Sequence, residues 1–327
     1  MRTKKTCLLL AFLLLFVNIF SFKNVITTEA ATTKPKLTGK IVFHNYSDYY
    51  KGDSKMYIYD FAKNKLSCIS KNWTNVINPM NAMFRKDGKA IVFMGETKDG
   101  EWDIFEYKFN GKNPTNLTKG NGLDDEDPKY SPNGKSIVYK RSNSSGKGTS
   151  IIEYNTVSKK RTVLIKGNTE KSMPYYSGDG KKLFYIEGSE SNMYVRVADI
   201  SNRKNIKTKK LYKKSGCHSY YPIADKSGRY VYFSRAYSKD NDSDQIVRYD
   251  LKNNKAKMMP FNKKDSDFSD TCIVSSKYLI VSSTVGGHGA YDLYLVDTSG
   301  KVRINLDKYN KKINTKMNEL GCDYYPD

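Results

Sequence analysis

The chain of 327 residues is poor in three residue types that often carry chemistry: it has three histidines, two tryptophans and five cysteines. The cysteines form neither a Cys-x-x-Cys pair nor a Cys/His spacing of the kind that binds zinc. There is no Gly-x-Ser-x-Gly stretch, the nucleophile elbow of α/β-hydrolases. Beyond the N-terminal segment no amphipathic helical pattern occurs. These absences argue against a zinc module, a serine hydrolase and a helical fold.

The N-terminus has the three-part layout of a secretory signal peptide. Arg2, Lys4 and Lys5 precede an apolar run from Cys7 to Phe22, and a polar stretch then ends at Ala30 and Ala31. An uncleaved anchor is the alternative, but the run is shorter than the ~20 residues of a spanning helix. We therefore predict a signal peptide over residues 1–30. The mature chain, residues 31–327, should be secreted or otherwise extracytoplasmic and should not span a membrane.

Lysine and arginine outnumber aspartate and glutamate by 56 to 34, a formal net charge of +22. Loss of residues 1–30 would remove four cations and one acid and leave +19. A basic exported chain is attracted to polyanions, and those abundant outside a cell are wall polymers, acidic polysaccharides and phospholipid headgroups. We expect anionic cell-envelope polymers rather than nucleic acid as electrostatic partners.

Four cysteines remain after Cys7 leaves with the signal peptide: Cys68, Cys217, Cys272 and Cys322. They allow three disulfide pairings, and export would permit such bridges. A mature chain of almost 300 residues buries enough core to fold without them. Disulfides and free thiols both stay open.

One phrase recurs along the chain: a short aromatic strand, an Asp/Asn-Gly-Lys turn and an alternating apolar strand. Its clearest copies are residues 127–139 and 173–185, in which we expect Tyr130 and Tyr176 to be packing residues. The same turn position is occupied at intervals of 46 to 49 residues by Gly39, Gly88, Gly134, Gly180, Gly228 and Ser276. Because Asn and Gly tolerate positive φ, we predict a type I′ hairpin in each copy.

A third strand rich in β-branched and aromatic residues follows each hairpin, and a polar turn then leads to a short fourth strand. Six four-stranded antiparallel units of this kind predict an all-β fold, a six-bladed β-propeller. The chain ends on the first half of the phrase, at residues 323–327, and residues 38–43 form its second half. We therefore predict that N- and C-terminal strands pair within one blade and close the ring.

The Pro-x-Tyr-Ser-x-Asn/Asp-Gly-Lys phrase and the segment from Thr97 to Phe105 resemble the propeller repeats of the TolB-like family. The resemblance covers residues 38–327, and we expect no counterpart of the extra N-terminal domain of the family's namesake. It implies a six-bladed propeller that binds proteins or ligands. We expect no cofactor.

In such a blade the loops between blades and those between second and third strands share one face, here called the upper face. Histidine and tyrosine suit ligand recognition, and the candidates in or beside those loops are His44, Tyr46, Tyr49, Tyr50, His218, Tyr220, His288 and Tyr324. The three histidines keep open a metal-assisted carbohydrate lyase or hydrolase. Asp240, Asp242 and Asp244 are a weak metal candidate, because the glycine and distal glutamate of an EF-hand are missing.

The two hairpins within each blade share the opposite face, the lower face, and are rich in cations. The candidates for binding polyanions are Lys159, Lys160, Arg161, Lys181 and Lys182, although solubility alone would also account for lysine in exposed turns. The leading hypothesis is a non-catalytic binding or scaffold propeller that recognises a protein, peptide or glycan at its upper face. A purely structural envelope component is a third interpretation.

Overall fold

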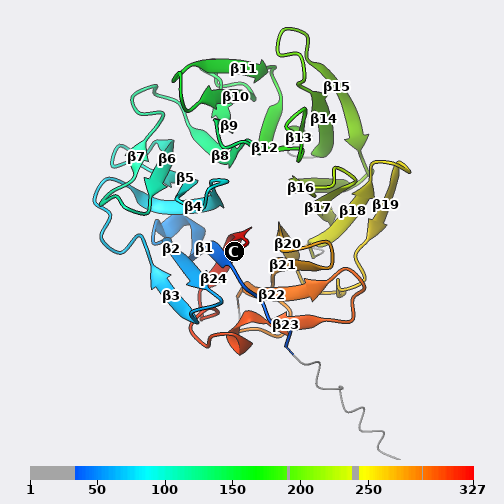
Figure 1. Cartoon of the computed structure of the whole chain (residues 1–327). Coiled ribbons are helices and arrows are strands. Elements are labelled where there is room, and N and C mark those ends of the chain that lie inside the picture. Colours follow the sequence, from blue (N-terminus) through cyan, green and yellow to red (C-terminus); the bar gives the residue numbers. More distant parts are fainter. Residues whose placement is uncertain (1–33, 190–191, 238–242, 289) are drawn as a thin grey trace, which may run out of the picture. The chain divides into compact units, whose positions relative to one another are not determined.

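The computed structural model describes residues 34–189, 192–237, 243–288 and 290–327. The chain divides into two units, Met1–Thr33 and Lys34–Asp327, and the predicted signal peptide lies outside the described residues. The second unit consists of six four-stranded antiparallel sheets arranged in a ring (Figure 1). The prediction of a six-bladed β-propeller is confirmed. The helices described in it are two short 3-10 turns, η1 (Tyr49–Lys51) and η2 (Leu306–Lys308).

Each blade is given from its innermost to its outermost strand. Blades 1 to 3 consist of β24 (Asn318–Tyr325), β1 (Lys40–Tyr46), β2 (Lys55–Asp60) and β3 (Lys65–Cys68); β4 (Ile77–Phe84), β5 (Ala90–Glu96), β6 (Trp102–Lys108) and β7 (Thr115–Asn116); and β8 (Asp125–Tyr130), β9 (Ser136–Ser142), β10 (Thr149–Asn155) and β11 (Arg161–Ile165). Blades 4 to 6 consist of β12 (Glu170–Tyr176), β13 (Lys182–Gly188), β14 (Tyr194–Asp199) and β15 (Lys207–Tyr212); β16 (Cys217–Ala224), β17 (Tyr230–Tyr237), β18 (Gln245–Asp250) and β19 (Lys255–Met258); and β20 (Phe268–Ile273), β21 (Tyr278–Ser283), β22 (Asp292–Asp297) and β23 (Arg303–Asn305).

Blade 1 joins the two ends of the propeller. Its inner strand β24 pairs with β1 from Lys40 opposite Tyr325 to Tyr46 opposite Asn318. The other three strands of the blade come from the beginning of the unit. The prediction that N- and C-terminal strands close the ring is therefore confirmed.

The first hairpin of each blade shows why the repeated phrase contains serine, Asn/Asp and glycine. In blade 3 the Gly134 N–H donates to the Ser131 carbonyl at 2.8 Å, and the Ser131 hydroxyl accepts the Ser136 N–H at 2.9 Å. The Asn133 side chain accepts the Lys135 N–H at 2.9 Å. Of the central turn residues only Gly134 has positive φ, 71°. The predicted type I′ turn is wrong, because serine and asparagine side chains hold a longer turn in which glycine alone is left-handed.

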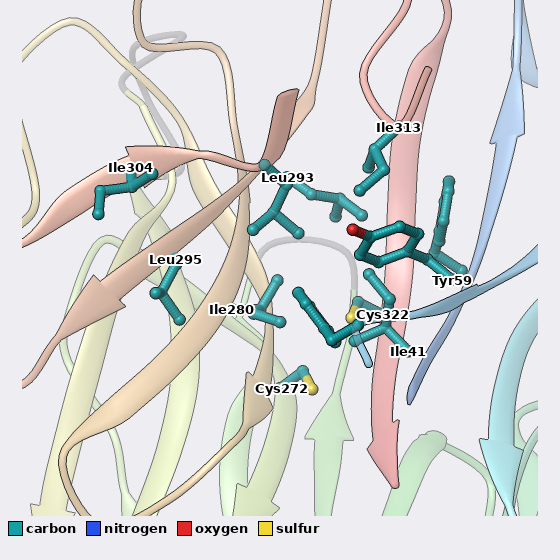
Figure 2. Packing of buried hydrophobic residues seen from close by; sticks show 12 residues of the cluster. Ile41, Tyr59, Cys272, Ile280, Leu293, Leu295, Ile304, Ile313 and Cys322 are labelled. Carbon is teal, nitrogen blue, oxygen red and sulfur yellow. The ribbon is translucent and has the colours of Figure 1, made fainter. Parts of the chain in front are cut away.

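The core consists of six apolar clusters, one between each pair of neighbouring blades. Figure 2 shows the cluster between blades 6 and 1, in which Ile280 and Leu295 of blade 6 pack with Ile41 and Tyr59 of blade 1. Ile280 and Leu295 are fully buried, and burial of such a side chain stabilises the fold by about 1.5–3 kcal/mol. The ring is therefore held mainly between blades.

The tyrosine of the repeated phrase links neighbouring blades. Tyr130 and Tyr176 are 2 % and 3 % exposed, which confirms them as packing residues. The Tyr130 hydroxyl donates to Glu106 of blade 2 at 2.7 Å, and the Tyr176 hydroxyl donates to Glu153 of blade 3 at 2.8 Å. The inner strands β8 and β12 are thereby fixed to the third strands of the preceding blades.

Candidate functional site

Two cavities follow one another along the central channel. The larger one, here called the upper cavity, has a volume of about 570 Å³ and receives a residue from every inner strand: Met80, Glu126, Ser172, Tyr221, Ser269 and Leu320. Residues of the second strands and of upper-face loops complete its wall: His44, Met94, Lys140, Tyr49, Met193 and Tyr291. A smaller pocket of about 60 Å³ lies below it, between the lower halves of the same inner strands.

A β-bulge in every inner strand shapes this channel. The register between the inner and second strand shifts in all six blades. Every inner strand has a residue with positive φ at such a shift, between 47° and 60°: Asn81, Asp127, Met173, Tyr221, Asp270 and Gly321. β4 has a second one, Asn78, at its first shift. A bulge turns an extra residue out of the ladder and re-aims its side chain, and all six of these residues line one or both cavities.

All six bulge residues therefore face the channel, and they are the part of the site that the sequence analysis did not identify. The signal was present, because in the two clearest copies of the phrase the bulge residue is the first one, Asp127 or Met173. Gly321 has a structural reason to be glycine: a Cβ there would lie 2.5 Å from the ring of His44.

Hydrogen bonds between bulges connect the blades around the channel. The Asp127 carboxylate accepts the Met173 N–H at 3.2 Å, and the Met173 sulfur accepts the Tyr221 N–H at the same distance. The Asp270 carboxylate accepts the Gly321 N–H at 3.4 Å. Backbone donors that the bulges remove from the ladders are thus satisfied by the neighbouring blade.

The narrow part of the channel contains buried charges of both signs. Lys129 donates to the Asn81 carbonyl at 3.5 Å, and burial lowers the pKa of its ammonium although Asp127, Asp323 and Asp270 lie near. Burial also raises the pKa of Asp270 and of Asp323 to about 6. Asp323 accepts the Phe84 N–H at 2.8 Å, which joins blade 1 to blade 2.

Glu319, near the start of β24, is a further buried carboxylate in the closing blade. It accepts hydrogen bonds from the Thr315 hydroxyl at 2.6 Å and from the Asn45 side chain at 3.3 Å. Burial nevertheless raises the pKa of Glu319 to about 7. A carboxyl group with this pKa changes its protonation state near neutrality.

Of the three predicted histidines, only His44 lines the upper cavity. Its Nδ1 accepts the Asn81 N–H at 3.4 Å, and burial, with a smaller effect of Lys129, lowers its pKa to about 3, so the ring is neutral. His218 is buried and stacks on Tyr220 at 6.1 Å. His288 Nδ1 lies 3.0 Å from an Asp292 carboxylate oxygen.

The predicted tyrosines separate into three groups. Tyr46, Tyr49 and Tyr50 form a row of edge-to-face rings with centroids 6.0 Å and 5.4 Å apart, which runs from the cavity to solvent, where Tyr50 is 94 % exposed. Tyr220 stacks on His218, and neither residue lines the upper cavity. The placement of Tyr324 on the upper face is wrong: it follows the bulge at the lower end of β24, and its hydroxyl donates to the Thr38 carbonyl at 3.0 Å.

The weak metal candidates lie partly outside the described residues, since Asp240 and Asp242 belong to the segment 238–242. Asp244 is described, and burial followed by the charges of Asp267 and Asp270 raises its pKa to about 7. In residues 34–189, 192–237, 243–288 and 290–327, no group of three or more His, Cys, Asp or Glu side chains is arranged to hold a metal ion. The four predicted cysteines are free thiols, and Cys272 and Cys322 share one apolar cluster (Figure 2).

The five predicted cations of the lower face lie on two hairpins of neighbouring blades. Lys159, Lys160 and Arg161 are at the turn between β10 and β11, and Lys181 and Lys182 are at the turn between β12 and β13. All five are exposed. Within the described part of the chain, no helix has the length and apolar character needed to cross a bilayer.

The TolB beta propeller domain model matches residues 25–222, more than half of the chain. The chain belongs to the TolB beta propeller family. This family assignment agrees with the six-bladed ring described above. No curated protein sequence matches the chain.

Solved structures of the same fold come from proteins of different kinds. TolB from Acinetobacter baumannii is 16 % identical with a TM-score of 0.69, and the match covers 90 % of this chain and 68 % of TolB. Hydrazine synthase from Kuenenia stuttgartiensis is 12 % identical with a TM-score of 0.65, covering 89 % of this chain and 47 % of the enzyme chain. A chain of a nidogen/laminin complex is 10 % identical with a TM-score of 0.62, covering 88 % and 98 %. At these identities the similarity concerns the fold, and the fold does not decide function.

Proposed function

We propose that this TolB-family propeller is a non-catalytic binding domain whose upper cavity receives a segment of a partner protein. The observation that supports this function best is the cavity of about 570 Å³ to which all six inner strands contribute. Its volume lies within the ~300–1,000 Å³ usual for ligand sites. Methionine and tyrosine, which are prominent in its wall, are enriched at protein interfaces because they adapt and combine apolar area with a polar end.

The row of rings from Tyr46 to Tyr50 extends this surface beyond the cavity. Tyr50 is held on η1 by Asp48, whose carboxylate accepts the Tyr50 N–H at 2.9 Å. An exposed aromatic side chain on a fixed turn loses little freedom when a partner covers it. The fold is found both in an enzyme and in a chain of a protein complex, so it does not distinguish catalysis from binding. The proposed function is therefore based on the upper cavity.

The proposal is tested by site-specific photo-crosslinking in the producing cell. A benzophenone amino acid at Tyr50 should capture one defined partner, whereas the same group at Val157, which is 74 % exposed on a lower hairpin, should not. The product at Tyr50 should disappear in a Met193→Trp background, because the indole occupies part of the upper cavity. Identical products at Tyr50 and Val157, or a product that Met193→Trp leaves unchanged, would refute the proposed function.

Export and envelope association are the second part of the proposal. The N-terminal charge and apolar pattern supports export, and the exposed cations of the lower hairpins support attraction to anionic envelope polymers. A propeller that lies with its lower face on the envelope would leave the upper cavity open to a partner. The test compares retention on isolated anionic envelope polymer between a lower hairpin variant, Lys181→Glu with Lys182→Glu, and an upper control, Lys263→Glu with Lys264→Glu. Both variants change the net charge equally.

A further inference from the structure

The upper cavity is acidic although the chain is strongly basic. Glu126, Asp127, Glu170 and Asp270 line it, opposed by Lys140, while the whole chain has a formal charge of +22. Lys140 is already engaged, at 2.7 Å from Glu126 and 3.8 Å from Glu170. Asp127 and Asp270 belong to no ion pair formed by the described residues, and the buried Lys129 that lies near both lines the smaller pocket below. The cavity therefore offers carboxylates without a cation in contact.

Neighbouring phenol groups respond to this negative potential. Burial and then the charge of Asp270 raise the pKa of Tyr46 to about 12. For Tyr49 the pKa is raised by burial, followed by Glu126 and Asp127. Carboxylates thus help to raise the pKa of two tyrosines around the opening. The negative potential therefore extends over the cavity and is not confined to one local contact.

The rest of the wall suits a long aliphatic stem. Met80, Met94, Met173 and Met193 supply flexible thioether side chains, and tyrosine rings attract cations through their faces. Ser172 adds a polar group: it is 2 % exposed, lines the cavity, and its hydroxyl has no hydrogen-bond partner among the described residues. A buried hydroxyl without a partner is costly, and a ligand N–H would satisfy it.

We propose that the upper cavity binds a lysine or arginine side chain of a partner protein, with the charged head between Asp127 and Asp270 and the stem against the methionines. This inference rests on the proposed function, since it specifies which part of the partner enters the cavity. A protein side chain is favoured over a free amine because the tyrosine row continues the surface outside the cavity to the exposed Tyr50.

The test is selection of random heptapeptides on the purified protein. Peptides whose binding is lost with Met193→Trp should be enriched in lysine or arginine at one position. Replacing that residue by glutamine should weaken binding at least 10-fold. Asp270→Asn combined with Glu170→Gln should weaken the parent peptide by a similar factor; asparagine suits the positive φ of position 270 and can still accept the Gly321 N–H.

Asp199→Asn, at the exposed lower end of β14, is the control and should bind the peptide as the parent does. Cavity-dependent peptides without a basic residue would overturn the cation assignment and leave the proposed function standing. Micromolar binding of spermidine with no basic peptide selected would assign the site to a free amine and overturn it as well. Selection of no cavity-dependent peptide would count against both proposals.

Discussion

Closure of the ring by β24 can be tested by shortening that strand. Deleting residues 323–327 removes the three pairs that join Val42, Ile41 and Lys40 to β24. It also leaves the buried Phe84 N–H without the Asp323 carboxylate, which accepts it at 2.8 Å. Blade 1 would then expose part of the edge of β1 to the channel.

The expected loss of stability follows from these contacts. Three side-chain hydrogen bonds disappear, from Phe84 N–H to Asp323, from Tyr324 to Thr38, and from Gly39 N–H to Asp327, each contributing about 1 kcal/mol net. The ladder bonds and the contact of Tyr325 with Phe84, with ring centroids 5.6 Å apart, add to this. Because the shortened chain has five fewer residues to order on folding, part of this loss is offset, and we expect a net loss of about 4–6 kcal/mol, a large part of the ~5–15 kcal/mol that stabilises a typical protein.

Thermal unfolding of the full and shortened chains is the assay. At an unfolding entropy of about 2 cal/mol/K per residue, a loss of about 5 kcal/mol lowers the midpoint of a propeller of this size by roughly 8 °C. Deleting only residues 326–327 is the matched control, because it removes the Gly39–Asp327 bond and leaves β24 intact. Equal midpoints for the two deletions would refute the role given to β24.

Three further predictions concern pH, salt and catalysis. The pKa of Glu319 is about 7 in the folded state, above its unfolded value of about 4.3, so the free energy of unfolding should fall as pH rises through this window. Urea unfolding at pH 5 and pH 8 measures this change, and Glu319→Gln should reduce it by about 3 kcal/mol. The control Asp199→Asn should leave it unchanged. The lower hairpin variant should lose retention on isolated anionic envelope polymer. The parent should lose retention as salt rises, since the Debye length is about 8 Å at 0.15 M. Equal retention of the lower hairpin variant and the upper control would refute the adhesion proposal. No lyase or hydrolase turnover of acidic glycans is expected with or without divalent metal, and turnover that His44→Ala abolishes would restore the enzyme alternative.

The fold could be predicted because its determinants are local and repeat. A glycine with left-handed φ recurs in five of the six blades, and it marks the first hairpin whatever the turn type. The turn type itself was predicted wrongly, because the hydrogen bonds of Ser131 and Asn133 decide it and dipeptide preference does not include them. Closure was predictable because the two ends of the chain carry complementary halves of one phrase.

The channel was less accessible to sequence reasoning for a physical reason. Bulge residues show no alternation of apolar and polar side chains, and only the register shift reveals that Met173 or Tyr221 points into the ring. Tyr324 was misplaced for a different reason: it pairs with Ile41 near the lower end of β24, beside the first hairpin and away from the upper loops.

The positions that differ between blades are the ones that can recognise a ligand. The turn glycine of the hairpin phrase recurs in five of the six blades because those blades need a left-handed residue at the same place. At the bulge the six blades present Asn81, Asp127, Met173, Tyr221, Asp270 and Gly321, an amide, two carboxylates, a thioether, a phenol and no side chain. A ring with six equal positions could bind only a symmetric ligand on its axis, whereas this one places Asp127 and Asp270 in blades 3 and 6, on opposite sides of the channel, and methionine between them. An elongated side chain with one charged end matches that asymmetric arrangement. The double variant Met173→Asp with Asp270→Met keeps the number of charges in the cavity and should abolish peptide selection.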